Sequence, residues 1–225
     1  MTDFLKDDEF LKLEKEYKFL SRARSRHGDV KQLSYIVLDL ETTGLDPATD
    51  EIIEIGAIKS ENGELKDIFN KLIKPTRQVS SHITELTGIS QEMLNDELPA
   101  KPVLEQFAKY IDDMVLIAHN ADFDISFLRN AFKKYLNRDL NNLIVCTLLI
   151  SRDILPNLSN HKLHTIGSYY GLPIENRHRA IGDSELTYQV WLKMSEKLKE
   201  KNISTRKDLE DYMARLGCPR QDKVV

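Results

Sequence analysis

Residues 35 to 45 read YIVLDLETTGL, and this stretch decides how the chain is interpreted. Its first part, residues 35–38, is an unbroken apolar run, which is typical of a strand buried on both faces of a sheet. Because side chains alternate along a strand, Asp39 and Glu41 share one face while Leu40 points to the other. The pattern predicts two neighbouring carboxylates at the carboxyl end of a buried strand, where α/β proteins bind ligands. Taken alone, the Asp39-Leu40-Glu41 pattern is better explained by two surface acids before a turn.

The segments around this stretch predict an α/β domain with a mixed sheet flanked by helices. An isoleucine-rich strand at 51–59, an Asn62-Gly63 turn and a strand at 65–73 make a hairpin. Further strands are expected at 114–118 and 143–146. Apolar periodicity, proline and glycine positions and one T-x-x-D capping box predict helices over 3–26, 81–88, 90–94, 102–113 with Pro102 first, 121–135, 162–170, 180–198 and 205–216.

Composition excludes several classes of protein. Of the 225 residues, 41% are hydrophobic and 30% charged, the balance of a globular chain rather than a disordered one. The longest nearly apolar run, 143–150, is far shorter than the roughly 20 residues that span a bilayer. The charged N-terminus lacks the pattern of a secretory signal, so we expect a cytoplasmic protein that does not bind membranes. Cys146 and Cys218 form no CxxC pair, which argues against a disulfide framework or a cysteine zinc site.

The net charge of −4 is unevenly distributed. Residues 1–33 carry a net +1 and residues 193–225 a net +3, whereas residues 34–192 carry a net −8. The overall charge argues against a protein that binds nucleic acid through bulk charge alone. The acidic middle is either a solvated surface or the place where carboxylates meet around metal cations.

Two further groups of polar residues follow predicted strands or begin predicted helices. HNADFD at 119–124 follows the strand at 114–118. Helix capping by Asn120 or Asp122 explains part of it, but helical spacing puts Asp124 on the side that faces the protein. HRAIGD at 178–183 begins the last long helix. Since five helical residues rotate by about 500°, His178 and Asp183 serve one site only if His178 precedes the helix.

Three other histidines have ordinary explanations. His161 and His164 are expected to make a helix-start hydrogen bond and a core contact rather than bind a metal. His119 is as well explained by a structural role at a strand end as by a role in a site. We therefore assign none of them to the predicted site.

The three motifs together resemble those of the DEDDh-type 3′→5′ exonucleases of the DnaQ-like family, which includes the epsilon-like proofreading subunits of DNA polymerase III. They are D-L-E-T-T-G-L at 39–45, H-N-A-x-F-D at 119–124 and H-x-A-x-x-D at 178–183, and the resemblance covers residues 34–197. It implies an RNase H-like fold and two Mg²⁺ or Mn²⁺ ions held by Asp39, Glu41, Asp124 and Asp183. It also implies that His178 is the general base. The substrate-binding residues implied are Thr42, Thr43, Gly44, Leu45 and Asn120. Residues 82–89 are similar to the family's substrate-side helix, without individual roles.

The resemblance implies an enzyme that shortens nucleic acid from a free 3′ end to nucleoside 5′-monophosphates in proofreading, replication or repair. Single-stranded DNA is the expected substrate. One alternative is an oligoribonuclease-like exoribonuclease. The other is a noncatalytic replicase scaffold, which we rank last because all four acids and the histidine of the motifs are present. We expect a helical extension at 1–33, the exonuclease domain at 34–197 and a helical tail at 198–225. The terminal helices either pack on the domain or contact a polymerase subunit or a second copy of the chain.

Overall fold

The computed structural model describes residues 33–174 and 178–218, and within them a mixed sheet has the strand order β3-β2-β1-β4-β5. The strands are β1 (Tyr35–Thr42), β2 (Ile52–Glu61), β3 (Glu64–Leu72), β4 (Val115–Ala118) and β5 (Ile144–Cys146). β1 and β3 each pair antiparallel with β2, whereas β4 pairs parallel with β1 and β5. The predicted α/β class, the first strand buried on both faces and the hairpin are confirmed. The helix expected at 3–26 lies outside the described residues.

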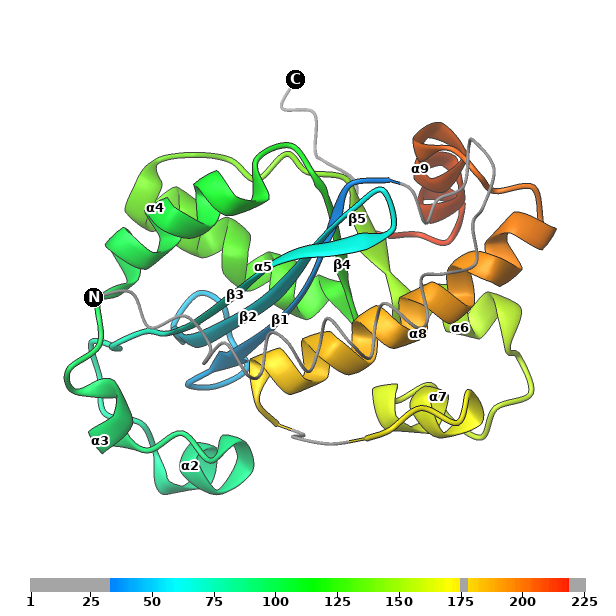
Figure 1. Cartoon of the computed structure of the whole chain (residues 1–225). Coiled ribbons are helices and arrows are strands. Elements are labelled where there is room, and N and C mark those ends of the chain that lie inside the picture. The colour runs from blue at the N-terminus through cyan, green and yellow to red at the C-terminus, as the bar shows by residue number, and fades with distance from the viewer. Residues whose placement is uncertain (1–32, 175–177, 219–225) are drawn as a thin grey trace.

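Helices cover both faces of this sheet, as Figure 1 shows: α8 crosses one face, and α4 and α5 lie on the other. α6 and α7 pack beside α8. The helices are α2 (Ser81–Thr87), α3 (Gln91–Leu94), α4 (Ala100–Ile111), α5 (Ala121–Ala131), α6 (Thr147–Ile154), α7 (Leu163–Tyr169), α8 (Ala180–Glu200) and α9 (Arg206–Arg215), and a short π-helix (Phe132–Leu136) continues α5.

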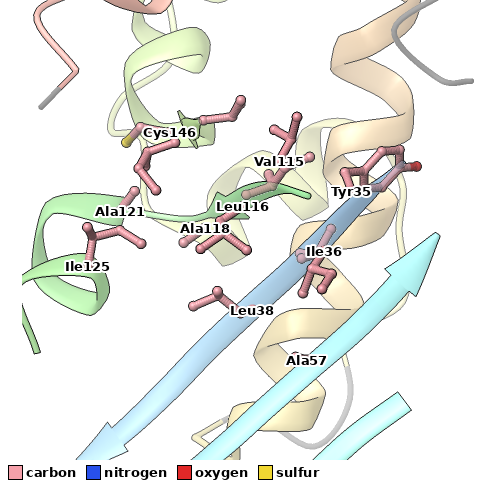
Figure 2. Close-up of a cluster of buried hydrophobic side chains, with 14 of the residues drawn as sticks. Tyr35, Ile36, Leu38, Ala57, Val115, Leu116, Ala118, Ala121, Ile125 and Cys146 are labelled. Carbon is pink, nitrogen blue, oxygen red and sulfur yellow. The ribbon is translucent and has the colours of Figure 1, made fainter. Parts of the chain in front are cut away.

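Strand β1 has apolar neighbours on both faces, which explains its unbroken apolar run. Tyr35 faces α8, where its ring centre lies 5.9 Å from that of Trp191. Ile36 and Leu38 point to the opposite face, toward the side of β4 and α5 (Figure 2). These four side chains are fully buried. Burying such a side chain typically contributes about 1.5 to 3 kcal/mol, so this packing fixes the strand that carries Asp39 and Glu41.

The main differences from the predicted helices concern α4, α5, α8 and α6. α4 begins at Ala100, so Pro102 is third in the helix rather than first. Proline is tolerated there because the first four N–H groups have no partner within the helix. The helix expected to 135 changes to π geometry after residue 131, and α8 extends to residue 200. α6 was not predicted, because its apolar residues continue the run of β5 without a break in the pattern.

The last helix packs onto the main core. Thr205 and Asp208 form the predicted capping box at the start of α9. Leu209, Tyr212 and Met213 are buried in the same core cluster as β1. The domain boundaries at 33/34 and 197/198 stay predictions. Among the described helices, none is long and apolar enough to cross a membrane.

Candidate active site

Three predicted carboxylates meet where α8 crosses the end of β1. Asp39 and Glu41 lie on the face of β1 that α8 covers, and Asp183 lies in the first turn of α8. One carboxylate oxygen from each lies within 4.8 Å of the others. Residues 144 positions apart in the sequence therefore come together because α8 packs directly against β1.

Asp124 is held beside this cluster by the backbone of β1. It is 3% exposed in the first turn of α5, which follows β4, the parallel neighbour of β1. Its Oδ1 accepts a hydrogen bond of 3.1 Å from the N–H of Leu40, the residue between Asp39 and Glu41. Asn120 occupies the N-cap of α5, as expected, in the left-handed conformation with φ of 60°, but its side chain makes no capping hydrogen bond.

Burial, together with neighbouring carboxylates for Asp39 and Glu41, disfavours the ionised form of this cluster. Burial, followed by the charges of Asp124 and Asp183, raises the pKa of Asp39. Burial and then the charge of Glu54 raise the pKa of Glu41 to about 8. Burial raises the pKa of Asp124 to about 8. In the described part of the chain, no lysine or arginine makes an ion pair with Asp39 or Glu41.

This donor set fits a divalent cation. It offers hard oxygen ligands from several carboxylates, with neither sulfur nor an ammonium group among them. A bound cation would stabilise the ionised form of each carboxylate, so it would reverse the pKa shifts that burial produces. The group of Asp39, Glu41 and Asp183, with Asp124 beside it, is therefore our candidate metal centre.

Raising the pH from about 5 to about 8 should lower the free energy of unfolding of the metal-free protein. The raised pKa values of Asp39, Glu41 and Asp124 mean that the folded state binds more protons than the unfolded state across this range. Their stabilising contribution is therefore complete below the carboxyl pKa of the unfolded chain and is lost as the pH rises toward about 8. Burial lowers the pKa of His119 to about 4. This histidine has the opposite effect, because between about pH 4 and 6.5 its contribution raises the free energy of unfolding as the pH rises.

Melting temperature against pH, in chelator and in excess Ca²⁺, measures this effect. The metal-free curve should fall from about pH 6.5 to about 8, and Ca²⁺ should flatten it. A metal-free melting temperature that rises over this interval would contradict the electrostatic description of the cluster.

His178 lies before the start of α8, as it must if His178 and Asp183 serve the same site. It has φ of 60°, and α8 begins two residues later at Ala180. Its N–H donates a hydrogen bond of 3.1 Å to Oδ2 of Asp183. His178 itself is exposed. The carboxylate of Asp183 therefore fixes the backbone of His178 at the edge of the cluster.

Glu54 and Arg179 form an ion pair that the sequence analysis did not identify. Glu54 is fully buried in β2, opposite Glu41 of β1. Nε and Nη2 of Arg179 donate to its carboxylate at 3.1 to 3.2 Å and 2.7 Å, and the N–H of Ala180 donates at 3.0 Å. An acid inside the apolar run of residues 52–58 was the available signal, since a buried charge requires a partner.

Gly56 lets the start of α8 lie directly on β2. A Cβ at this position would lie 2.3 Å from the backbone of Ala180 and Ile181, a distance that no side chain tolerates. The hydroxyl of Ser184 donates to the carbonyl of Gly56 at 2.9 Å. Together with Glu54, these contacts fix the segment that carries His178 and Asp183 relative to β1 and β2.

Arg179→Met should lower the free energy of unfolding by about 3 kcal/mol, because it leaves the carboxylate of Glu54 buried without its cation. The side chain of Arg179 is 34% exposed, which keeps this figure at the low end of the range for buried pairs. The double variant Glu54→Leu/Arg179→Met should regain most of the loss, since a packed apolar pair replaces the ion pair. Urea unfolding measures both variants. Equal stability of the single and double variants would contradict the description of Glu54 as a buried charge.

The predicted substrate-binding turn at residues 42–45 is tightly closed by its own hydrogen bonds. The hydroxyl of Thr42 donates to the carbonyl of Gly44 at 2.6 Å, and that of Thr43 accepts from the N–H of Glu51 at 2.9 Å. A Cβ on Gly44 would lie 2.3 Å from the carboxylate of Asp50. Leu45 is 84% exposed, so the turn presents an apolar side chain to solvent.

A cleft of about 610 Å³ adjoins the carboxylates. Asp39, Asp183 and Asn120 line it, but Glu41 and residues 42–45 do not. Its opposite wall comes from α6 and the start of α7 and includes His161 and His164. Nδ1 of His161 lies 3.1 Å from the hydroxyl of Ser151 in α6, so its hydrogen bond reaches another helix and is not the helix-start bond that was expected. His161 and His164 thus line the same cleft as Asp39 and Asp183, a position that their spacing in the sequence does not reveal.

Comparison with known proteins assigns the family. A family model described as "Exonuclease" matches residues 36–191. The PolC-type DNA polymerase III of Thermotoga maritima is 40% identical over 177 residues, which are 79% of this chain and 13% of the polymerase. The PolC-type DNA polymerase III of Bacillus subtilis is 38% identical over 198 residues, 88% of this chain and 14% of the polymerase. The chain thus spans about one seventh of these relatives.

Solved exonuclease structures share the fold. Exonuclease X in complex with 5′-overhanging duplex DNA superimposes with a TM-score of 0.64 at 20% identity, over 79% of this chain and 98% of that chain. E. coli exonuclease I in complex with a dT13 oligonucleotide gives a TM-score of 0.65 at 18% identity, over 81% of this chain and 44% of that chain. Because the family model matches more than half of the residues, the chain belongs to the exonuclease family.

Proposed function

We propose that the protein is a metal-dependent 3′→5′ exonuclease that hydrolyses DNA to nucleoside 5′-monophosphates. The observation that carries this proposal is the meeting of Asp39, Glu41 and Asp183 within 4.8 Å, beside the buried Asp124, in a chain of the exonuclease family. Four carboxylates without a cation would repel a phosphodiester. Cation binding is therefore a condition for this site to accept nucleic acid.

In this proposal, Asp39, Glu41, Asp124 and Asp183 hold two Mg²⁺ or Mn²⁺ ions. When bound, such ions stabilise the negative charge that develops on the attacking and leaving oxygens of a phosphodiester. His178 accepts the proton of the attacking water as general base. The water oxygen joins phosphorus, the bond from phosphorus to O3′ breaks, and the shortened strand keeps a 3′-hydroxyl.

The remaining predicted residues position the end of the strand. The turn Thr42, Thr43, Gly44 and Leu45 contacts the terminal nucleotide, with the exposed Leu45 against the base. Asn120, at the rim of the cleft, contacts the adjoining nucleotide. The hydrogen bonds that the turn makes within itself and with Glu51 support this role, because a turn fixed before binding loses little conformational freedom when the nucleotide binds.

DNA is the proposed substrate because the matched relatives are DNA polymerases, although this chain spans only 13 to 14% of their length. The exonuclease I structure with dT13 supports a single strand as the form that enters such a fold. A polymerase subunit is the proposed protein partner on the same grounds. An exoribonuclease would use the same acids, so preference for RNA is an outcome that the experiment must distinguish.

The experiment compares matched single-stranded DNA, duplex DNA and RNA oligonucleotides with Mg²⁺ or Mn²⁺. Single-stranded DNA with a free 3′-hydroxyl should shorten stepwise to 5′-monophosphates. A 3′-phosphate should block this reaction, whereas a blocked 5′ end should not. Faster degradation of RNA than of DNA would show that RNA, rather than DNA, is the preferred substrate. Internal cleavage of a circular single strand would contradict exonuclease action.

A further inference from the structure

The wall of the cleft opposite the carboxylates carries two exposed cations. We define the α6–α7 wall as Leu148 and Arg152 of α6 with His161, Lys162, Leu163 and His164 at the start of α7. In the described part of the chain, neither Arg152 nor Lys162 takes part in an ion pair. Building on the proposed function, we propose that this wall is a phosphate subsite for the phosphodiester on the 5′ side of the scissile bond.

The position of the cleft gives the substrate its direction. Asp39 and Asp183 line the cleft, but Glu41 and residues 42–45 do not. In the view of Figure 1, the loop after β1 and the helices α6 and α7 lie on different sides of the start of α8, the helix that carries Asp183. If the turn holds the terminal nucleotide and the carboxylates surround the scissile phosphate, the strand continues into the cleft. The next phosphate then faces Arg152 and Lys162.

The charge of the wall fits a polyanion. Residues 34–192 carry a net −8, so two cations facing a carboxylate cluster run against the trend of this segment. Arginine and lysine supply most of the contacts through which proteins neutralise nucleic-acid phosphates. The cleft volume of about 610 Å³ lies within the usual range of ligand sites, about 300 to 1,000 Å³. The cleft can therefore accept a nucleotide unit rather than a single ion.

Hydrogen bonds fix the wall. Oδ1 of Asn160 accepts from the N–H of Lys162 at 3.1 Å and from the hydroxyl of Thr165 at 2.7 Å, which orders the start of α7. The hydrogen bond between His161 and Ser151 ties this segment to α6, the helix that carries Arg152. The two cations therefore project from a common frame, across the cleft from Asp183.

Two probes separate this subsite from the proposed chemistry. The first is a single-stranded DNA oligonucleotide, whose binding is measured in Ca²⁺ and whose hydrolysis is measured in Mn²⁺. The second is the p-nitrophenyl ester of thymidine 5′-monophosphate, which has a phosphodiester to cleave but no upstream nucleotide. The variant is Arg152→Ala/Lys162→Ala, with Arg152→Gln/Lys162→Gln as a second form. The matched control, Lys101→Ala/Lys109→Ala on α4, removes the same charge from exposed positions outside the cleft.

We expect the α6–α7 variant to bind the oligonucleotide about 10 to 100 times more weakly. The slope of log binding constant against log salt should fall by about 0.7 for each phosphate that the variant no longer neutralises, whereas the control should keep both values. The kcat/KM for the oligonucleotide should fall at least tenfold more than that for the ester. A salt slope equal to that of the control, or an equal fall in kcat/KM for both substrates, would overturn the subsite.

The outcomes also separate the subsite from the proposed function. Wild-type protein that hydrolyses neither probe, but whose salt slope still depends on Arg152 and Lys162, would overturn the exonuclease and retain the wall as a nucleic-acid binding surface. Wild-type protein that binds no oligonucleotide would overturn both. Melting temperatures of both double variants show whether each is folded.

Discussion

Asp39→Ala and Asp183→Ala are each expected to reduce exonuclease activity by about 10³-fold or more while leaving a folded protein. Losing one carboxylate removes a ligand of the proposed metal centre, and metal stabilisation of the transition state is worth several kcal/mol. The metal-free variants should melt at higher temperature than the wild type, because each removes one of several charges that repel one another. The gain should be smaller for Asp183→Ala, since Asp183 also accepts the N–H of His178.

Activity and melting temperature must be measured on the same samples, with Glu105→Ala, an exposed acid of α4, as the control. The control should keep wild-type activity. An inactive Asp39→Ala protein that is also unfolded would show that Asp39 has a structural role rather than a role in metal binding. A folded, active Asp39→Ala protein would exclude it from the site.

His178→Ala is expected to lower turnover by about 10² to 10⁴-fold, the usual contribution of a general base. Cation binding should change little, because the proposed ligands are the four carboxylates. Oligonucleotide binding in Ca²⁺ should persist for the same reason. Single-turnover hydrolysis and equilibrium binding measure the two effects separately.

The pH dependence of the rate provides the control for this variant. As general base, His178 accepts a proton only when its ring is neutral, so the rise of wild-type turnover with pH should flatten in His178→Ala. If His178 only caps or packs, its loss would lower stability and leave the rate per folded molecule unaltered. A variant with wild-type turnover and an unchanged pH profile would remove His178 from the mechanism.

The sheet could be predicted because its strands carry strong local signals. The apolar run at 35–38 predicts a strand buried on both faces, and Asn62-Gly63 predicts the hairpin of β2 and β3. The capping residues of α9 were equally informative. The start of α4 and the π-helix after α5 could not be predicted, because α4 begins without a side-chain cap and no local pattern marks the change to π geometry.

The candidate site was predictable only in part. Asp39 and Glu41 follow from strand alternation, but their meeting with Asp183 depends on where α8 packs. The resemblance to a family brought these residues together before the structure did. Glu54 and Arg179 lie 125 positions apart, and no spacing rule connects them. The sequence likewise did not predict that Arg152 and Lys162 face the carboxylates, since a cleft between elements far apart in the sequence depends on the fold.

Divalent-cation dependence of stepwise 3′ degradation tests the account most directly. A single-stranded DNA oligonucleotide labelled at its 5′ end should remain intact in excess EDTA and shorten by single nucleotides when Mg²⁺ or Mn²⁺ is restored. Ca²⁺ should support binding with little turnover, because its looser coordination positions the reacting groups less well. The Asp39→Ala protein should leave the oligonucleotide intact under all these conditions. Undiminished hydrolysis by the wild-type protein in excess chelator would contradict the assignment of the carboxylate cluster as the catalytic metal centre.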